Sequence, residues 1–281
     1  MLSLLEVIQK TADFFSKKTL ESPRLNAELL IGHALGLKRM QLYLQFERML
    51  SESELESIRP LVKRRGQREP LQYILGETEW SGLRLKVDRR ALIPRPETEM
   101  LIELLLSFME TPPSTILDMG TGSGVIALAL AQKFANAKVF AIDQSEEALE
   151  LAKENAKALC LADQVHFLRS NWFEAVPSGA GFDAIVSNPP YLTQTEIEAA
   201  EPEVRAHEPI SALVSDEAGM ADLSKIIADA PAFLNAGGLL ALETGIDQHP
   251  MLKIKLQTAG FGRIESRQDL TGRDRFMFAW L

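Results

Sequence analysis

Thr115-Ile-Leu-Asp-Met-Gly120-Thr-Gly-Ser-Gly124 is the stretch of sequence that decides the fold of this chain. Its first half is a short apolar run typical of a buried strand, and three glycines at alternate positions follow before a helical pattern begins. A strand that turns through glycines into a helix is typical of a parallel sheet covered by helices. In such a sheet a ligand lies at the carboxyl ends of the strands, beside this turn.

Strand and helix patterns continue to alternate downstream. The expected strands are 115–119, 138–142, 164–168, 182–187 and 238–243, and the expected helices are 123–135, 145–159 and 219–235. Two last runs, 261–266 and 275–280, flank a polar turn and predict an antiparallel hairpin at the sheet edge. The chain is therefore expected to form an α/β, Rossmann-like sheet of seven strands.

Residues 1–75 predict a small helical bundle. The start signals Ser22-Pro23 and Ser51 each precede apolar residues at helical spacing. This part has no glycine-rich loop and too small a core to host chemistry, so we expect it to bind a protein partner.

A β-hairpin linker is expected over residues 76–95. Strand-like runs at 72–76 and 83–87 flank a Ser81-Gly82 turn. The sheet domain is then expected to span residues 96–281.

Charge is divided unevenly along the chain, whose net charge is −9. Residues 1–95 contain 17 Lys+Arg and 12 Asp+Glu, a net +5, whereas residues 96–281 contain 13 and 27, a net −14. An acidic sheet domain repels nucleic acid over most of its surface, so direct nucleic-acid binding is not expected. The basic part can face an acidic partner or RNA, or it can simply present solvated helix faces.

Composition also bears on the compartment, on membrane insertion and on metal binding. The single cysteine, Cys160, cannot form an internal disulfide, which favours a reducing, cytoplasmic compartment. No run of 18 apolar residues without charge is present, so no transmembrane helix is expected. The four histidines lack ligand spacing, and we expect no metal site.

The glycine turn predicts an adenosine ligand with a positive charge. Asp143 ends the next strand, about 20 residues further on, where a carboxylate can accept both ribose hydroxyls. The turn is a poor dinucleotide fingerprint, because Val125 stands where the third glycine or alanine would be. Asp118 beside the turn disfavours a pyrophosphate and suits the sulfonium and ammonium groups of S-adenosylmethionine.

Asn188-Pro189-Pro190-Tyr191 ends the fourth strand, at the same edge of the sheet. Two prolines contribute no N–H groups, so the chain leaves the sheet there and the Pro189 carbonyl has no ladder partner. The Asn188 oxygen and the Pro189 carbonyl can together accept the N–H bonds of one planar NH₂ group, and the Tyr191 ring can pack against it. This arrangement favours methyl transfer to an amide or aromatic amine nitrogen through positioning and electrostatics.

With both motifs, the sequence resembles the HemK/PrmC family of release-factor glutamine methyltransferases. The similarity runs over most of the chain and includes Glu69–Gly76, Leu92–Glu99, Asp118–Gly124, Asn188–Tyr191 and Glu208-Pro209. It implies a class I methyltransferase domain behind a small helical domain that binds the release factor.

The resemblance also implies roles for single residues. The cofactor S-adenosylmethionine, which leaves as S-adenosylhomocysteine, would be bound by Gly120, Thr121, Gly122, Ser123, Gly124, Asp143 and Asn188, with Trp172 against the adenine. Asn188, Pro189, Pro190 and Tyr191 would hold the acceptor glutamine, which lies in the Gly-Gly-Gln loop of class 1 release factors, and Asn188, Pro189 and Tyr191 would act in catalysis. The segment Arg205–Ser211 would help to shape the substrate entrance, and a contact of Ile93–Glu99 with substrate is as plausible as a purely structural role for that segment.

Two other functions share parts of this pattern. An N6-adenine DNA or RNA methyltransferase uses the same Asn-Pro-Pro-Tyr logic, although the acidic sheet domain disfavours it. A methyltransferase-like module that binds without catalysis is the other alternative, and the intact Asp118, Asp143 and Asn188 disfavour it.

Overall fold

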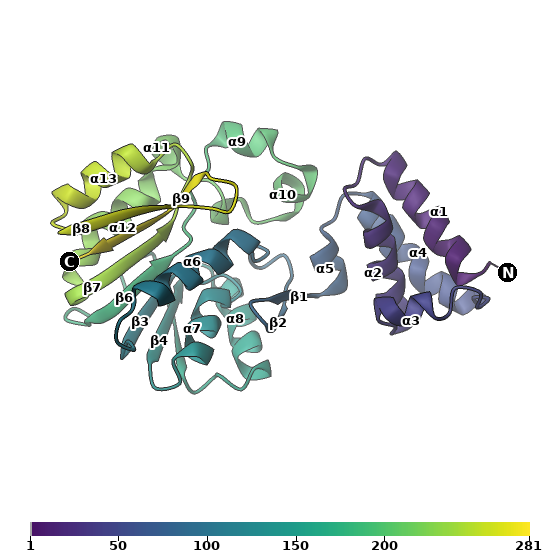
Figure 1. The fold of residues 1–281 in the computed structure, drawn as a ribbon, viewed down its shortest axis with the longest axis horizontal. Helices are drawn as coiled ribbons and strands as arrows, with labels where there is room; N and C mark the ends of the chain where they lie inside the picture. Colours follow the sequence, from purple (N-terminus) through teal and green to yellow (C-terminus); the bar gives the residue numbers. More distant parts are fainter. Residues whose placement is uncertain (1) are drawn as a thin grey trace. The chain divides into compact units, whose positions relative to one another are not determined.

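The computed structural model describes residues 2–281, which form two compact units (Figure 1). The helical unit comprises Met1–Glu77 together with a short later segment, Glu201–His207. The sheet unit comprises Thr78–Ala200 and Glu208–Leu281. The segment 201–207 is thus separated in sequence from the unit in which it packs.

The helical unit is built from short helices around one apolar core. Its helices are α1 (Leu4–Lys17), α2 (Pro23–Leu35), α3 (Arg39–Tyr43), α4 (Glu52–Gly66), α5 (Leu71–Leu75) and α10 (Pro202–His207). The predicted starts of α2 at Pro23 and of α4 after Ser51 are confirmed, and Ser51 forms a reciprocal capping box with Glu54. Apolar side chains of α1, α2, α4 and α5 form the core.

The strand-like prediction for residues 72–76 is wrong, because these residues belong to α5. Pro70 precedes the helix as its N-cap, and Gly76 ends it in the left-handed conformation at φ +76°. A five-residue apolar run fits either a strand or one helical turn. Here one helical turn buries the side chains of Tyr73 and Ile74, and this burial favours the helix over the strand.

The sheet unit contains the predicted mixed sheet of seven strands. The strands are β3 (Thr115–Met119), β4 (Lys138–Asp143), β5 (Val165–Arg169), β6 (Phe182–Ser187), β7 (Leu234–Glu243), β8 (Arg263–Gln268) and β9 (Asp274–Trp280). Their order across the sheet is β5-β4-β3-β6-β7-β9-β8. The first five are parallel, and β9 and β8 form the predicted antiparallel edge.

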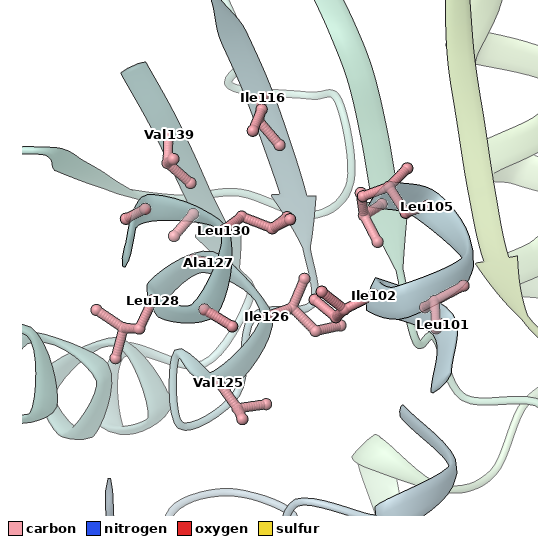
Figure 2. Close-up of a cluster of buried hydrophobic side chains, with 14 of the residues drawn as sticks. Leu101, Ile102, Leu105, Ile116, Val125, Ile126, Ala127, Leu128, Leu130 and Val139 are labelled. Carbon is pink, nitrogen blue, oxygen red and sulfur yellow. The ribbon is translucent and has the colours of Figure 1, made fainter. Parts of the chain in front are cut away.

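Helices cover both faces of this sheet (Figure 1). The covering helices are α6 (Pro96–Phe108), α7 (Val125–Lys133), α8 (Glu146–Ala158), α12 (Ala221–Asp229) and α13 (His249–Thr258). The segments between β6 and β7 add α9 (Gln194–Ala199), α11 (Asp216–Gly219) and 3₁₀ turns at Ile210–Ala212 and Ala230–Ala232. Side chains alternate along each strand, so Ile116 of β3 packs with α6 and α7 in one core, while Leu117 packs with α12 and α13 in the other. Figure 2 shows the first core, where α6 and α7 meet β3 and β4.

The β-hairpin of β1 (Glu77–Trp80) and β2 (Leu83–Lys86) packs onto the first core through Trp80, Leu83 and Leu85. The side-chain amide of Asn155 in α8 forms hydrogen bonds with the backbone at the end of β2, as a neighbouring strand would. Its Oδ1 accepts the Lys86 N–H at 2.7 Å, and its Nδ2 donates to the Lys86 carbonyl at 3.0 Å and to the Ser123 carbonyl at 2.9 Å. One buried amide therefore holds both the hairpin and the glycine turn.

Candidate functional site

Three strand ends bring the predicted site together. In the register of the sheet, Met119 of β3 pairs with Ile142 of β4 on one side and with Ser187 of β6 on the other. The residues that follow these three positions are Gly120, Asp143 and Asn188, so the two sequence motifs leave the sheet side by side. The Ser187 hydroxyl donates to the Met119 carbonyl at 2.7 Å and ties β6 to the glycine turn.

Asp143 closes the glycine turn from the next strand. Its Oδ2 accepts the Gly122 N–H and its Oδ1 accepts the Ser145 N–H, both at 2.9 Å. Burial raises the pKa of this carboxyl, while the backbone N–H groups oppose that rise. Each oxygen keeps a second lone pair, so the carboxylate can accept further hydroxyl groups at the carboxyl edge of the sheet.

Asp118 supports the turn from below. Its Oδ2 accepts the Thr121 hydroxyl at 2.6 Å and the Ala127 N–H at 3.0 Å, which caps the first turn of α7. Its Oδ1 is buried and accepts no hydrogen bond from residues 2–281. Burial, with a smaller contribution from the charge of Asp143, raises the pKa of Asp118 to about 7, although the hydrogen bonds from Thr121 and Ala127 oppose the rise.

A cavity of about 110 Å³ opens at this edge of the sheet. Six of the predicted site residues line it: Gly120, Gly122, Asp143, Trp172, Asn188 and Pro190. Five others do not line it: Thr121, Ser123, Gly124, Pro189 and Tyr191. Thr121 and Ser123 are buried within the turn, and Gly124 is the N-cap of α7.

Trp172 forms one wall of the cavity. Its backbone is left-handed, with φ +52°, and the Ser170 hydroxyl donates to its carbonyl at 2.6 Å. The indole N–H donates to Asp222 Oδ1 at 3.0 Å, and the ring lies beside Gly120, where an added Cβ would come within 3.7 Å of it. The ring is thus fixed next to the glycine turn.

Tyr191 donates to the buried carboxylate of Glu243, and Asn188 reaches the same carboxylate through the Thr98 hydroxyl. The Asn188 Nδ2 donates to the Thr98 hydroxyl at 3.1 Å, and the Tyr191 hydroxyl donates to Glu243 Oε1 at 2.9 Å. The Arg275 guanidinium lies 5.6 Å from the centre of the Tyr191 ring. Burial and the charge of Glu243 raise the pKa of Tyr191, which keeps the phenol protonated.

The cavity also contains residues that the sequence did not assign. Arg90, Ala91 and Leu92 line it ahead of α6, and Gln144, Ser145 and Ala148 line it at the start of α8. They follow the predicted Asp143 directly or precede the Ile93–Glu99 segment, and this adjacency is the only signal that could have found them.

The segment after α10 completes the lining. Pro209 and Ser211 line the cavity, and Ala212 joins them, while a role of Arg205–Ser211 at the substrate entrance stays a prediction. Arg95, at the N-cap of α6, forms an ion pair with the buried Glu208 and so fixes the start of this segment. Burial raises the pKa of Glu208, and Arg95 opposes that rise.

Two further properties bear on the class of site. No three His, Cys, Asp or Glu side chains within residues 2–281 come together as metal ligands. In the same described range, no helix is long and apolar enough to cross a membrane.

Comparisons with known proteins show the family of the chain. Residues 6–76 match the PrmC N-terminal domain, and residues 98–204 match the methyltransferase small domain. A release factor glutamine methyltransferase of Chlorobaculum tepidum is 40% identical over 284 residues, which cover 97% of this chain and 95% of that protein. Those of Rhodopirellula baltica and Vibrio cholerae are 36% and 42% identical, covering 98% and 91% of this chain and 95% and 88% of theirs.

Solved structures agree on the fold. A methyltransferase from Pyrococcus furiosus superposes with a TM-score of 0.54 at 21% identity, covering 71% of this chain and 89% of that chain. A T. thermophilus 16S rRNA methyltransferase, solved in complex with AdoMet and guanosine, gives a TM-score of 0.53 at 21% identity and covers 73% of this chain and 49% of that chain. These likenesses confirm the α/β methyltransferase fold. Because the similarity to curated relatives runs over nearly its whole length, the chain belongs to the family of release factor glutamine methyltransferases.

Proposed function

We propose that this protein transfers a methyl group from S-adenosylmethionine to the side-chain amide nitrogen, N5, of the glutamine in the Gly-Gly-Gln loop of class 1 release factors. The product of the cofactor is S-adenosylhomocysteine. The observation that carries the proposal is the side chain of Asn188, which lines the cavity and gives its NH₂ group to Thr98. Its oxygen is then left to accept an N–H of a second amide.

The residues of the cavity fit S-adenosylmethionine. Asp143 offers carboxylate oxygens to the ribose hydroxyls, and Gly120 and Gly122 let the backbone approach the ligand closely. Trp172 offers a fixed aromatic wall for the adenine. We assign these four residues to the cofactor. We assign Thr121, Ser123 and Asp118 to the support of the turn because their side chains are buried, and Gly124 because it is the N-cap of α7.

The residues at the end of β6 would bind the acceptor. An amide nitrogen is a poor nucleophile because its lone pair is delocalised into the carbonyl group. No donor within residues 2–281 is bonded to the Asn188 Oδ1 or to the Pro189 carbonyl, so both can accept N–H bonds from one glutamine NH₂. Two acceptors that hold both N–H bonds orient the lone pair and favour its tetrahedral geometry.

The bound cofactor supplies the electrophilic methyl group. In that transfer the nitrogen lone pair would form the new N–C bond, and the electrons of the broken S–C bond would remain on sulfur. The methylated nitrogen is then acidic and loses one proton to water, so no general base has to be present beforehand. Tyr191, with its raised pKa, is unsuited to act as that base and is assigned to holding the site.

The test is methyl transfer from labelled S-adenosylmethionine to three acceptors in parallel. These are a class 1 release factor, the same factor with the glutamine of its Gly-Gly-Gln loop changed to alanine, and nucleic acid. Label on the intact factor alone supports the proposal. Label on nucleic acid, or equal label on both factors, refutes it and leaves the N6-adenine alternative or another acceptor.

Two variants test the assigned roles in the same assay. Asn188→Ala removes one acceptor, and we expect most of the turnover to be lost while cofactor affinity stays within about threefold. Asp143→Ala removes the carboxylate from the cofactor part of the cavity, and we expect weaker cofactor binding by calorimetry. Wild-type affinity in Asp143→Ala would contradict the ribose assignment.

We also infer that the protein works in the cytoplasm, where release factors act, without binding nucleic acid directly. The sheet unit supplies the cofactor site, and residues 96–281 carry a net charge of −14, from 13 Lys+Arg against 27 Asp+Glu. We assign the helical unit to contact with the release factor itself, since none of its family-matched residues, 6–76, lines the cavity.

A further inference from the structure

We propose that Thr98 and Glu243 are positioning residues that fix the orientation of the Asn188 side-chain amide, so that its NH₂ group faces Thr98 and its oxygen faces the cavity. This inference rests on the proposed function, because it gives the Asn188 oxygen the task of accepting an N–H of the substrate amide. Neither residue touches the substrate in this proposal. They act through Asn188.

The three side chains form one continuous hydrogen-bonded row. The Asn188 Nδ2 lies 3.1 Å from the Thr98 Oγ1, and the Thr98 Oγ1 lies 2.7 Å from the Glu243 Oε2. The other carboxylate oxygen, Oε1, accepts the Tyr191 hydroxyl at 2.9 Å. Thr98 and Glu243 are only 2% and 1% exposed, so water does not compete for these bonds.

The direction of the row follows from counting protons. A threonine hydroxyl has one proton, and an ionised carboxylate has none to give. When the Thr98 proton is donated to Glu243, the Thr98 oxygen can only accept from Asn188. The Asn188 amide must then present its NH₂ group to Thr98, which turns its oxygen away from the row, towards the cavity that Asn188 lines.

The protein keeps this row rigid through three separate elements. Ser187 of β6 pairs with Leu242 of β7, so Asn188 and Glu243 leave neighbouring strands side by side. Glu243 itself pairs with Phe276 of β9. Thr98 lies in the first turn of α6, whose start is fixed by the Arg95–Glu208 ion pair and by the Trp80 indole N–H, which donates to the Arg95 carbonyl at 2.8 Å.

Burying an ionised carboxylate costs free energy because the group loses its hydration, unless hydrogen bonds and nearby opposite charges replace the lost water. Burial raises the pKa of Glu243, while the Thr98 and Tyr191 hydroxyls and the Arg275 charge lower it. Two donated protons on the two oxygens, with a guanidinium nearby, are what an anion in this position requires. If Glu243 only filled space, an apolar side chain at the end of β7 would do so without this cost.

The test compares three variants in single-turnover methyl transfer to the release factor at saturating acceptor. In Thr98→Val the shape stays but the hydroxyl is lost, and we expect the rate to fall about 10- to 100-fold with cofactor affinity within about threefold. Thr98→Ser keeps the hydroxyl and should regain most of that rate. Glu243→Gln keeps the shape, but its NH₂ can donate to Thr98 and reverse the row, so it should behave like Thr98→Val.

Thr115→Val is the matched control. The Thr115 hydroxyl donates to the Gly181 carbonyl at 3.0 Å, at the start of β3 and away from the cavity. The loss of a threonine hydroxyl there should leave the rate unchanged. If Thr98→Val slowed the reaction no more than Thr98→Ser or Thr115→Val, the positioning role would be overturned.

A second readout does not depend on activity. The side-chain NH₂ signals of Asn188 are the pair of ¹⁵N–¹H cross-peaks that disappear in Asn188→Ala. We expect them to exchange with solvent at least about tenfold faster in Thr98→Val than in wild type or Thr98→Ser. Identical exchange in all three would refute the proposal, whereas absence of label on the release factor with wild-type enzyme would refute only the proposed function.

Discussion

Replacing Gly124 by alanine should destabilise the sheet unit for two separable reasons. Gly124 is the N-cap of α7 and has φ +86°, a conformation that costs a residue with a Cβ about 1–2 kcal/mol. The added Cβ would also lie 3.1 Å from the Ala152 Cβ, 3.3 Å from the Ala152 Cα and 3.2 Å from the Leu128 Cδ1. Helix α8 has to move to make room, and such overpacking costs about 1–3 kcal/mol.

A matched control separates the two terms. Gly272 has φ +79°, and an added Cβ there would meet no atom within 4 Å. Gly272→Ala should therefore show only the backbone cost, about 1–2 kcal/mol, whereas Gly124→Ala should lose about 2–5 kcal/mol in total.

Urea unfolding followed by tryptophan fluorescence measures this difference. The three tryptophans, Trp80, Trp172 and Trp280, all lie in the sheet unit, so the signal reports on the unit that contains both glycines. The urea midpoint should fall further for Gly124→Ala than for Gly272→Ala at equal slope. Equal midpoints would show that the close approach of Gly124 to α8 contributes nothing to stability.

Three other perturbations probe buried charge. Asp118→Asn should remove a pH dependence of stability. The pKa of Asp118 is about 7 in the folded protein and 3.8 in the unfolded chain, so the free energy of unfolding of the wild type falls as pH rises through this range. In ligand-free urea titrations the free energy of unfolding of the variant should rise by about 3 kcal/mol relative to wild type between pH 5 and 8. His249, whose pKa burial lowers below 6.5, has the opposite sign: wild type should lose stability relative to His249→Gln as pH falls from 7 to 5, and parallel curves would contradict the neutral buried histidine. Glu203→Gln breaks an ion pair with the buried Arg65, so amide hydrogen exchange in 201–207 should speed up about tenfold, whereas Glu52→Gln, in an exposed pair, should leave exchange unchanged in its own helix.

The strands of the sheet could be predicted because each is a short, nearly continuous apolar run. Parallel strands covered on both faces need apolar side chains at successive positions, as in Phe182–Ser187, so local sequence carries the signal. The two site motifs were equally local, since the glycine turn and Asn188–Tyr191 each occupy a single turn. Their meeting at one sheet edge followed from the parallel order alone.

The rest of the site depends on contacts between distant residues. Glu243 reads as the last residue of an apolar strand, yet its partners Thr98 and Tyr191 are 145 and 52 residues away in sequence. No periodicity links such positions. The five-residue helix α5 was mistaken for a strand for the opposite reason, because its local pattern fits both structures.

The placement of segment 201–207 determines how this protein can be dissected. Arg65 of α4 and Arg68, just after it, form ion pairs with Glu203 at 2.9 and 2.8 Å, although 138 and 135 positions of sequence separate the partners. A protein that starts at residue 78 would keep Glu201 and Glu203 but lack the guanidinium groups of Arg65 and Arg68 that pair with them. The helical unit is therefore not made from N-terminal residues alone, because its segment 201–207 would remain in a protein shortened to residues 78–281, and Glu201 and Glu203 would there lack their ion-pair partners.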